Sequence, residues 1–235
     1  MLDLPIAAEP QTDTSILPPI YECGEPMIPL STLSDKIKVY PFYYEQDYDG
    51  ATAESYLRVG AAKLLQQAAG LLPDGLFFVV LDGWRSYQVQ QSLYDRFKQS
   101  LLAQGWHEGE QLDRELAKFV ARPSQDVTRP SPHLTGGAID LTISGPNGWL
   151  EMGTEFDDFT NAAATRYFEE LPFYDERSLC IRDNRRLLFH LMAEVGFTNY
   201  PREWWHYEYG TISWARKNQT AAIYGGVLSL PVRDG

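Results

Sequence analysis

The stretch Ser131-Pro132-His133-Leu134-Thr135-Gly136-Gly137-Ala138-Ile139-Asp140-Leu141 places a histidine and an aspartate seven residues apart, with two glycines between them. Because glycine adopts positive φ angles without steric cost, Gly136-Gly137 predicts a tight turn. The alternation that follows predicts a strand over residues 138–143, with Asp140 on one face and apolar side chains on the core face. His133 and Asp140 are residue types that bind metal ions, so the stretch predicts one half of a metal site.

A third ligand and a catalytic base are offered by Glu203-Trp204-Trp205-His206. Catalytic zinc typically has three protein ligands and an open position for water, whose pKa it lowers to about 7. The predicted ligands are His133, Asp140 and His206. Glu203 then stays free to take a proton from the water. Residues three apart face opposite sides of a regular strand, so a turn or bulge is expected over residues 201–204.

Composition excludes several classes of partner. The chain has 235 residues, of which 44% are hydrophobic and 13% aromatic, enough for one domain with a substantial core. A formal net charge of −12 leaves no basic face for nucleic acid or anionic membranes, so neither is expected as a partner. No stretch approaches about 18 consecutive apolar residues. A homo-oligomer stays open.

The amino terminus lacks a basic region followed by an apolar run, so no signal peptide is visible. A cytoplasmic location is expected, or a periplasmic one if a leader was removed. Cys23 and Cys180 are the only cysteines, and they lie far apart without metal-type spacing. A disulfide framework is not expected, although a single disulfide between them stays open.

Hydrophobic periodicity predicts the elements around these motifs. Residues 1–35 are rich in proline and are expected to form an extended arm or leader, before a single domain over residues 36–235 that carries the predicted zinc site. Helices are expected at residues 51–69, from Ser86 to about Gly105, at 111–120 and at 183–195, and strands at 76–81, 138–143, 149–152 and 204–209. This pattern predicts an α+β domain with a central, mainly antiparallel sheet flanked by helices.

Four motifs together carry a family resemblance. S-x-H-x-x-G-x-A-x-D followed by E-W-W-H resembles the D-alanyl-D-alanine dipeptidases of the M15 metallopeptidase family, which includes the vancomycin-resistance dipeptidase. Asp82-Gly83-Trp84-Arg85 is similar to that family's D-G-[aromatic]-R segment, and Met152-Gly153-Thr154-Glu155-Phe156-Asp157 to its M-G-[small]-x-F-D segment. The motifs occur in family order from about Asp82 to Tyr209. The resemblance implies the D,D-peptidase (hedgehog-like) fold.

The resemblance also implies an activity and roles for further residues. The implied activity is hydrolysis of small D,D-dipeptides, with D-alanyl-D-alanine as the expected substrate, one zinc ion per chain and Glu203 as general base. Arg85 would stabilise the oxyanion, for which a planar and permanently charged donor is suited. Asp157 would receive the free ammonium group of the substrate. Ser131 either contacts the substrate through its hydroxyl or only shapes the loop before Pro132.

Two alternatives to a dipeptidase remain at this point. A D,D-carboxypeptidase or endopeptidase acting on peptidoglycan peptides of the cell wall would share the zinc site but need an open groove. A non-catalytic zinc-binding module of the same fold would be expected to lack the base, and Glu203 is present. The other two histidines, His107 and His190, are expected to be structural or solvated, and Trp204 and Trp205 to pack around the pocket.

Overall fold

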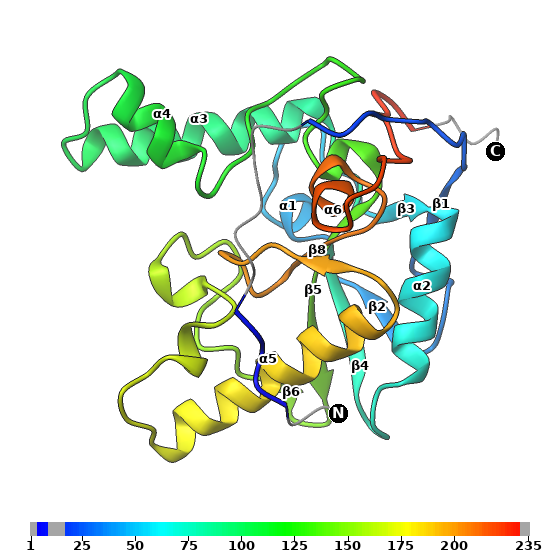
Figure 1. Ribbon diagram of the computed structural model, residues 1–235, viewed down its shortest axis with the longest axis vertical. Helices are drawn as coiled ribbons and strands as arrows, with labels where there is room; N and C mark the ends of the chain where they lie inside the picture. Colours follow the sequence, from blue (N-terminus) through cyan, green and yellow to red (C-terminus); the bar gives the residue numbers. More distant parts are fainter. Residues whose placement is uncertain (1–3, 9–16, 231–235) are drawn as a thin grey trace.

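The computed structural model describes residues 4–8 and 17–230. Its centre is a sheet with the strand order β2–β4–β5–β8–β7 (Figure 1). The strands are β2 (Ile37–Val39), β4 (Phe77–Asp82), β5 (Ala138–Gly145), β7 (Thr198–Asn199) and β8 (His206–Glu208), with β6 (Gly148–Trp149) paired to β5. β2 and β4 are parallel, whereas the other neighbouring strands are antiparallel. The predicted mainly antiparallel sheet is confirmed.

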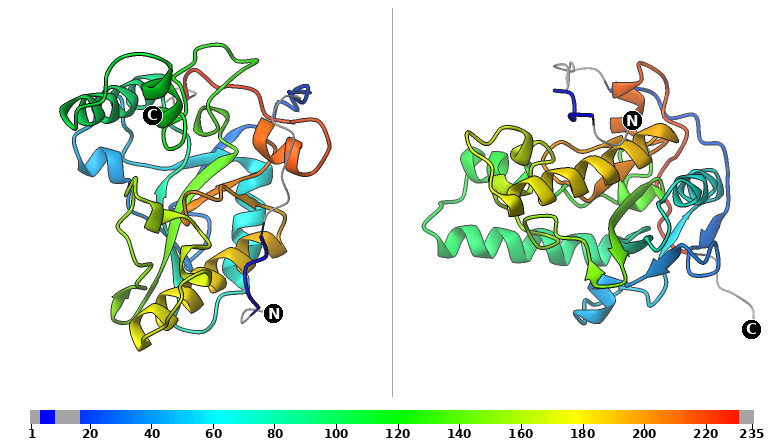
Figure 2. Two further views of the ribbon diagram at one scale, coloured as in Figure 1. Left: turned by 60° about the vertical axis from the view of Figure 1, so that its left-hand side comes forward. Right: turned by 90° about the horizontal axis from the view of Figure 1, so that it is seen from below.

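Helices surround this sheet and complete the α+β architecture. They are α1 (Phe42–Glu45), α2 (Val59–Gly70), α3 (Tyr87–Ala103), α4 (Glu110–Leu116), α5 (Glu176–Glu194) and α6 (Ile212–Lys217), with short 3₁₀ helices η1 (His133–Thr135), η2 (Asn161–Ala163) and η3 (Tyr167–Glu169). α5 crosses one face of the sheet beside α2, and α3 and α4 form a hairpin that projects from the body (Figures 1 and 2).

The central strand β5 separates the hydrophobic core from the candidate site because its side chains alternate. Ile139, Leu141 and Ile143 belong to the main buried cluster, together with Leu188 of α5. Asp140 faces the other way and lines a cavity. Every residue from 138 to 144 is buried, so the Asp140 carboxylate must find its partners inside the protein.

The two glycines before β5 serve different purposes. Gly136 ends η1 with a φ of 70°, as the predicted tight turn requires. Gly137 does not need a positive φ. A Cβ atom on Gly137 would instead collide with the backbone carbonyl of Tyr209, so glycine is required there by close approach of the two chain segments.

The helix predicted at residues 51–69 begins only at Val59, so the first part of that prediction is wrong. Residues 56–58 form β3 (Tyr56–Arg58), which pairs antiparallel with β1 (Met27–Pro29). The buried Arg58 side chain explains the change, because its Nε donates to the Thr135 carbonyl at 2.9 Å and its Nη1 to the Glu25 carbonyl at 2.7 Å. Tertiary pairing therefore overrides the helical periodicity of this segment.

The other helix predictions hold with shifted ends. Ser86 caps α3, as predicted, by accepting a hydrogen bond from the Val89 amide at 3.3 Å. α5 begins at Glu176 rather than at residue 183, because Asp175 and Ser178 form a reciprocal capping box. α4, β6 and β8 are shorter than predicted.

The described part of the N-terminal arm lies along the end of the chain. The Tyr21 amide donates to the Ala222 carbonyl at 2.8 Å, and the Cys23 amide donates to the Ile223 carbonyl at 3.1 Å. Cys23 and Cys180 are both exposed and free, so no disulfide joins them. The division into an arm and a domain at residue 35 stays a prediction.

Candidate active site

A cavity of about 250 Å³ opens on the face of the sheet that carries Asp140. Its walls come from β5, β8, α1, α3 and the segment that follows α4. It brings together six of the predicted site residues, namely Arg85, His133, Asp140, Asp157, Glu203 and His206. These six residues span 121 positions of the chain, from Arg85 to His206, and they meet in one cavity.

The three predicted metal ligands converge within this cavity. Asp140 of β5 lies directly opposite His206 of β8, and Nδ1 of His206 is 2.8 Å from Oδ1 of Asp140. His133 reaches the same point from η1, with its Nε2 3.3 Å from Oδ2 of Asp140 and 3.1 Å from Nδ1 of His206. One ligand atom from each residue lies within 4.8 Å of the others, and all three residues are buried.

The outer contacts of the two histidines show that this group fits a cation. Nδ1 of His133 lies 2.7 Å from the Gly83 carbonyl, which can only accept, so Nδ1 carries the proton and Nε2 carries a lone pair. Nε2 of His206 lies 3.2 Å from Oε1 of Glu208, so a neutral imidazole that donates to Glu208 presents the lone pair of Nδ1 to the group. Two lone pairs and the Asp140 carboxylate then face one another, and the donor that reaches this group is Nη2 of Arg85, at 3.2 Å from Oδ2 of Asp140. A divalent metal ion such as zinc satisfies this donor set.

Glu203 lies beside the three ligands without joining them. The turn predicted over residues 201–204 is present, since the Glu203 amide donates to the Tyr200 carbonyl at 3.1 Å. Oε2 of Glu203 is 3.9 Å from Nδ1 of His206. Burial raises the pKa of Glu203 to about 8, although His206 opposes the shift. A buried carboxylate with a raised pKa is suited to accept a proton and to return it.

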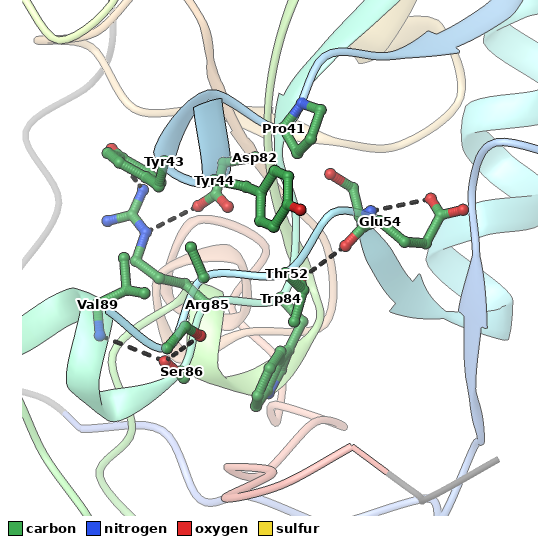
Figure 3. Close-up of a pocket in the computed structure, with 13 residues that line it drawn as sticks. Pro41, Tyr43, Tyr44, Thr52, Glu54, Asp82, Trp84, Arg85, Ser86 and Val89 are labelled. Carbon is green, nitrogen blue, oxygen red and sulfur yellow. Dashed lines mark hydrogen bonds and ion pairs between the residues drawn. The ribbon is translucent and has the colours of Figure 1, made fainter. Parts of the chain in front are cut away.

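Arg85 follows β4 and points into the cavity. Its Nε donates to Oδ2 of Asp82 at 2.8 Å and its Nη1 to Oε1 of Gln90 at 3.0 Å. Nη2 lies 3.2 Å from both the Tyr43 hydroxyl and Oδ2 of Asp140. Figure 3 shows the guanidinium between Tyr43 and Asp82, with the Tyr43 ring centre 4.7 Å from Cζ. Four partners thus hold this cation in one orientation.

Asp157 faces the same cavity from the loop after β6. It adopts a positive φ of 58°, which is uncommon for a residue other than glycine. Its Oδ2 accepts a hydrogen bond from the Tyr43 hydroxyl at 2.7 Å. Burial raises the pKa of Asp157 to about 7, although Arg85 and the Tyr43 hydroxyl favour the charged form. Binding a cation would restore its charge.

The charge balance of the cavity favours cationic ligands. Four carboxylates and one guanidinium line it, from Asp140, Asp157, Glu203, Glu208 and Arg85. This excess of negative charge attracts metal ions and ammonium groups, and it disfavours anionic ligands that lack a metal ion to bind them. A metal ion and a substrate ammonium would together neutralise much of it.

Ser131 does not line this cavity, although Pro132 and His133 do. Ser131 is buried, and its carbonyl accepts a hydrogen bond from the Leu134 amide at 3.1 Å. A contact between the Ser131 hydroxyl and substrate stays a prediction. Trp204 and Trp205 are buried as expected, and Trp204 donates through Nε1 to the Thr154 hydroxyl at 2.9 Å.

Sequence analysis missed the residues that support these groups. Glu208 could have been found, because it lies two residues after His206 and therefore on the same face of the strand. Asp82 begins a motif that was noted only for Arg85. Tyr43 carries no local signal, since it lies 42 positions before Arg85 in the chain.

In this α+β fold, two histidines and an aspartate meet beside a glutamate that is not one of the converging ligands. Such an arrangement is typical of metal-dependent hydrolases that activate water. Comparison with known proteins narrows this class. The M15 peptidase family, described as D-ala-D-ala dipeptidase, matches residues 56–222. A D-alanyl-D-alanine dipeptidase of Synechocystis sp. is 30% identical over 244 residues, which cover 92% of this chain and 98% of the relative. The chain therefore belongs to the M15 peptidase family, as its motifs predicted.

Three further similarities accompany this result. A D-alanyl-D-alanine dipeptidase of Escherichia coli is 38% identical over 136 residues, covering 57% of this chain and 56% of the relative. The vancomycin-resistance D,D-pentapeptidase VanY, solved with Zn(II), is 20% identical with a TM-score of 0.42, covering 75% of this chain and 89% of VanY. The D,D-dipeptidase VanXYg, solved with a D-Ala-D-Ala phosphinate analogue, is 22% identical with a TM-score of 0.38, covering 72% and 57%.

None of the helices within residues 4–8 and 17–230 is long and apolar enough to cross a membrane. His190 contacts the Leu4 carbonyl through Nε2 at 2.8 Å, in keeping with its expected structural role. The cytoplasmic location and the oligomeric state stay predictions.

Proposed function

We propose that this protein is a zinc-dependent dipeptidase that hydrolyses D,D-dipeptides, with D-alanyl-D-alanine as its substrate and one zinc ion per chain. Family membership supports this proposal, as do the names of its relatives. One structural observation carries it. The metal-type group of His133, Asp140 and His206 shares its cavity with the carboxylate of Asp157, which accepts a hydrogen bond from the Tyr43 hydroxyl and forms no salt bridge within residues 4–8 and 17–230.

Asp157 would bind the free ammonium group of the dipeptide. Burial disfavours the charged form of this carboxylate. An ammonium group would offset that cost, because it brings a full positive charge and hydrogen-bond donors. An ammonium held there places the first peptide bond of the substrate toward Glu203 and the metal-type group. A residue or a blocking group added at the amino end of the substrate would have to displace this contact, so Asp157 selects substrates with one residue before the scissile bond.

Glu203 would act as the proton carrier of the reaction. A zinc ion held by His133, Asp140 and His206 would polarise the scissile carbonyl and lower the pKa of water to about 7. Glu203 takes a proton from the attacking water and delivers it to the leaving amine, for which its raised pKa is suited.

Arg85 would stabilise the negative charge that develops on the carbonyl oxygen. Its Nη2 already points toward Oδ2 of Asp140, and therefore toward the point where the three ligands converge. The contacts with Asp82 and Gln90 hold the rest of the guanidinium, while Nη2, at 3.2 Å from Tyr43 and Asp140, is the nitrogen that faces the cavity. A donor that is oriented before the reaction is effective because it need not reorganise.

A panel of dipeptides tests this function directly. The zinc-loaded protein is incubated with free, N-acetylated and carboxy-amidated forms of L-alanyl-L-alanine and D-alanyl-D-alanine. Only free D-alanyl-D-alanine is expected to be hydrolysed at a substantial rate. Equal kcat/KM values for the free and N-acetylated D,D-substrates would reject a dipeptidase and favour a D,D-carboxypeptidase that acts on peptidoglycan peptides.

A further inference from the structure

One buried side chain of α5 joins the two ends of the loop that carries Asp157. Arg185 donates from Nε to the Met152 carbonyl at 2.7 Å, from Nη1 to the Ala164 carbonyl at 2.7 Å, and from Nη2 to the Ala162 carbonyl at 2.8 Å. Met152 precedes Asp157 in the chain, whereas the two alanines follow it. A single guanidinium therefore joins the two ends of the loop.

Within residues 4–8 and 17–230 no carboxylate forms a salt bridge with Arg185, although Arg185 is only 2% exposed and Asp158 acts on it from a longer distance. Burial lowers the pKa of Arg185 to about 9. Burying a cation without a counter-ion in direct contact is costly. The carbonyl groups and the faces of Phe168 and Trp204, whose ring centres lie 4.7 Å and 6.0 Å from Cζ, offset that cost. Lysine could not replace Arg185, because only the planar guanidinium has donors placed to bind three separate carbonyl groups.

The same loop is tied to the turn that carries Glu203. The Trp204 amide donates to the Ala163 carbonyl at 3.0 Å, and Nε1 of Trp204 donates to the Thr154 hydroxyl at 2.9 Å. Asp157 itself holds an uncommon backbone conformation, with a φ of 58°, which persists only where the surroundings enforce it. The position of its carboxylate relative to Glu203 therefore depends on how firmly the loop is closed.

We propose that Arg185 is a positioning residue for recognition of the substrate's amino terminus. It holds the Asp157 carboxylate at a fixed distance from Glu203, and it thereby sets the preference for free dipeptides over N-blocked ones. The residue touches neither substrate nor metal and acts only through the loop. This inference rests on the proposed dipeptidase function.

The neighbouring Arg186 provides a matched control. It lies on the same helix and is also buried, but it pairs with Glu169 of η3, with Nε–Oε1 at 2.7 Å and Nη2–Oε2 at 2.6 Å. Arg186→Lys therefore perturbs a buried arginine of α5 without opening the ends of the Asp157 loop. Any effect of helix destabilisation alone should appear in both variants.

The experiment compares the wild-type protein, Arg185→Lys and Arg186→Lys, all loaded with zinc. For each, zinc content, Tm, and KM and kcat for free and N-acetylated D-alanyl-D-alanine are measured. Arg185→Lys is expected to keep its zinc and to lose about tenfold or more of the preference for the free dipeptide, mainly through a higher KM, as for loss of one charge-assisted hydrogen bond. Arg186→Lys is expected to keep the preference even where its Tm falls equally.

The outcomes distinguish an error in the role of Arg185 from an error in the proposed dipeptidase function. An unchanged preference in Arg185→Lys, with a lower Tm, would make Arg185 merely structural. A wild-type protein without any preference would reject the proposed function itself. If Arg185→Lys does not fold, Thr154→Val loosens the same loop by removing the bond to Trp204. A reduced preference in that variant supports control by the loop, and an unchanged preference overturns it.

Discussion

Asp140 and His206 lie directly opposite each other on the paired strands β5 and β8, and Oδ1 and Nδ1 of these residues are 2.8 Å apart. The separation of two of the proposed metal ligands is thus set by the spacing of paired strands in the sheet. His133 joins them from η1, where the Gly83 carbonyl orients its ring. The site is therefore organised by the protein, and we expect the fold to survive removal of the metal.

Replacing Glu203 with alanine should abolish hydrolysis while the variant still binds zinc. The carboxylate is assigned as a base and not as a ligand, because it lies 3.9 Å from His206 Nδ1 and outside the converging group. Metal analysis and a dipeptide assay on the same preparation check this. His206→Ala is the control and should lose zinc. A Glu203→Ala protein that binds no zinc, or that turns over normally, would contradict the assignment.

Replacing Arg85 with alanine should lower kcat rather than raise KM. Removal of one oxyanion donor typically costs about 2.7–4 kcal/mol of transition-state stabilisation. Steady-state kinetics separate the two parameters. Because Arg85 also pairs with Asp82 at 2.8 Å, the Tm of the variant must be compared with that of Asp82→Asn, which weakens this pair but leaves the guanidinium in place. An effect confined to KM would exclude the oxyanion role.

Replacing Glu208 with alanine should weaken zinc binding about 10–100-fold, the range found when the outer partner of a metal ligand is removed. Glu208 accepts from Nε2 of His206 at 3.2 Å and is itself held by the Thr211 hydroxyl. Glutamine keeps an acceptor oxygen at this place, so Glu208→Gln should retain most of the affinity. Chelator competition gives both dissociation constants. If Glu208→Ala and Glu208→Gln lose zinc affinity equally, Glu208 does not act by orienting the His206 imidazole through a hydrogen bond.

Replacing Asp157 with asparagine should stabilise the metal-free protein increasingly as the pH rises from about 4 to 7. The pKa of Asp157 is raised by burial from 3.8 to about 7 in the folded protein. In that window the folded state binds the proton more tightly than the unfolded state, so the carboxyl lowers the free energy of unfolding as the pH rises. The slope is at most ~1.4 kcal/mol per pH unit, and it is smaller to the extent that the cavity is hydrated.

Urea unfolding of the wild-type and Asp157→Asn proteins in the presence of a chelator measures this slope. The difference in unfolding free energy should grow up to about pH 7 and stay constant above it. Parallel curves across this range would show that Asp157 titrates normally. The stabilised variant should nevertheless lose activity, because it gives up the counter-charge for the substrate.

The local sequence was sufficient to predict those site features that depend on the spacing of residues within one segment. The alternation around Asp140 predicted which face of β5 carries chemistry, because a strand has a period of two. The turn before His206 followed from the same rule, since a base and a ligand three residues apart cannot share the face of a regular strand. Ser86 marked the start of α3 through its own hydroxyl. These features are decided by neighbours in the chain.

Only the tertiary structure decided what surrounds those residues. Tyr43 meets both Arg85 and Asp157 from a helix of four residues, at separations of 42 and 114 positions, and no local pattern encodes such a meeting. The strand at residues 56–58 likewise exists because β1 pairs with it, although its own periodicity predicts helix. Arg185 lies in a helix whose sequence pattern shows only that part of it is buried. Its three carbonyl partners become visible in the folded chain, because the burial of one guanidinium depends on where distant backbone groups come to lie.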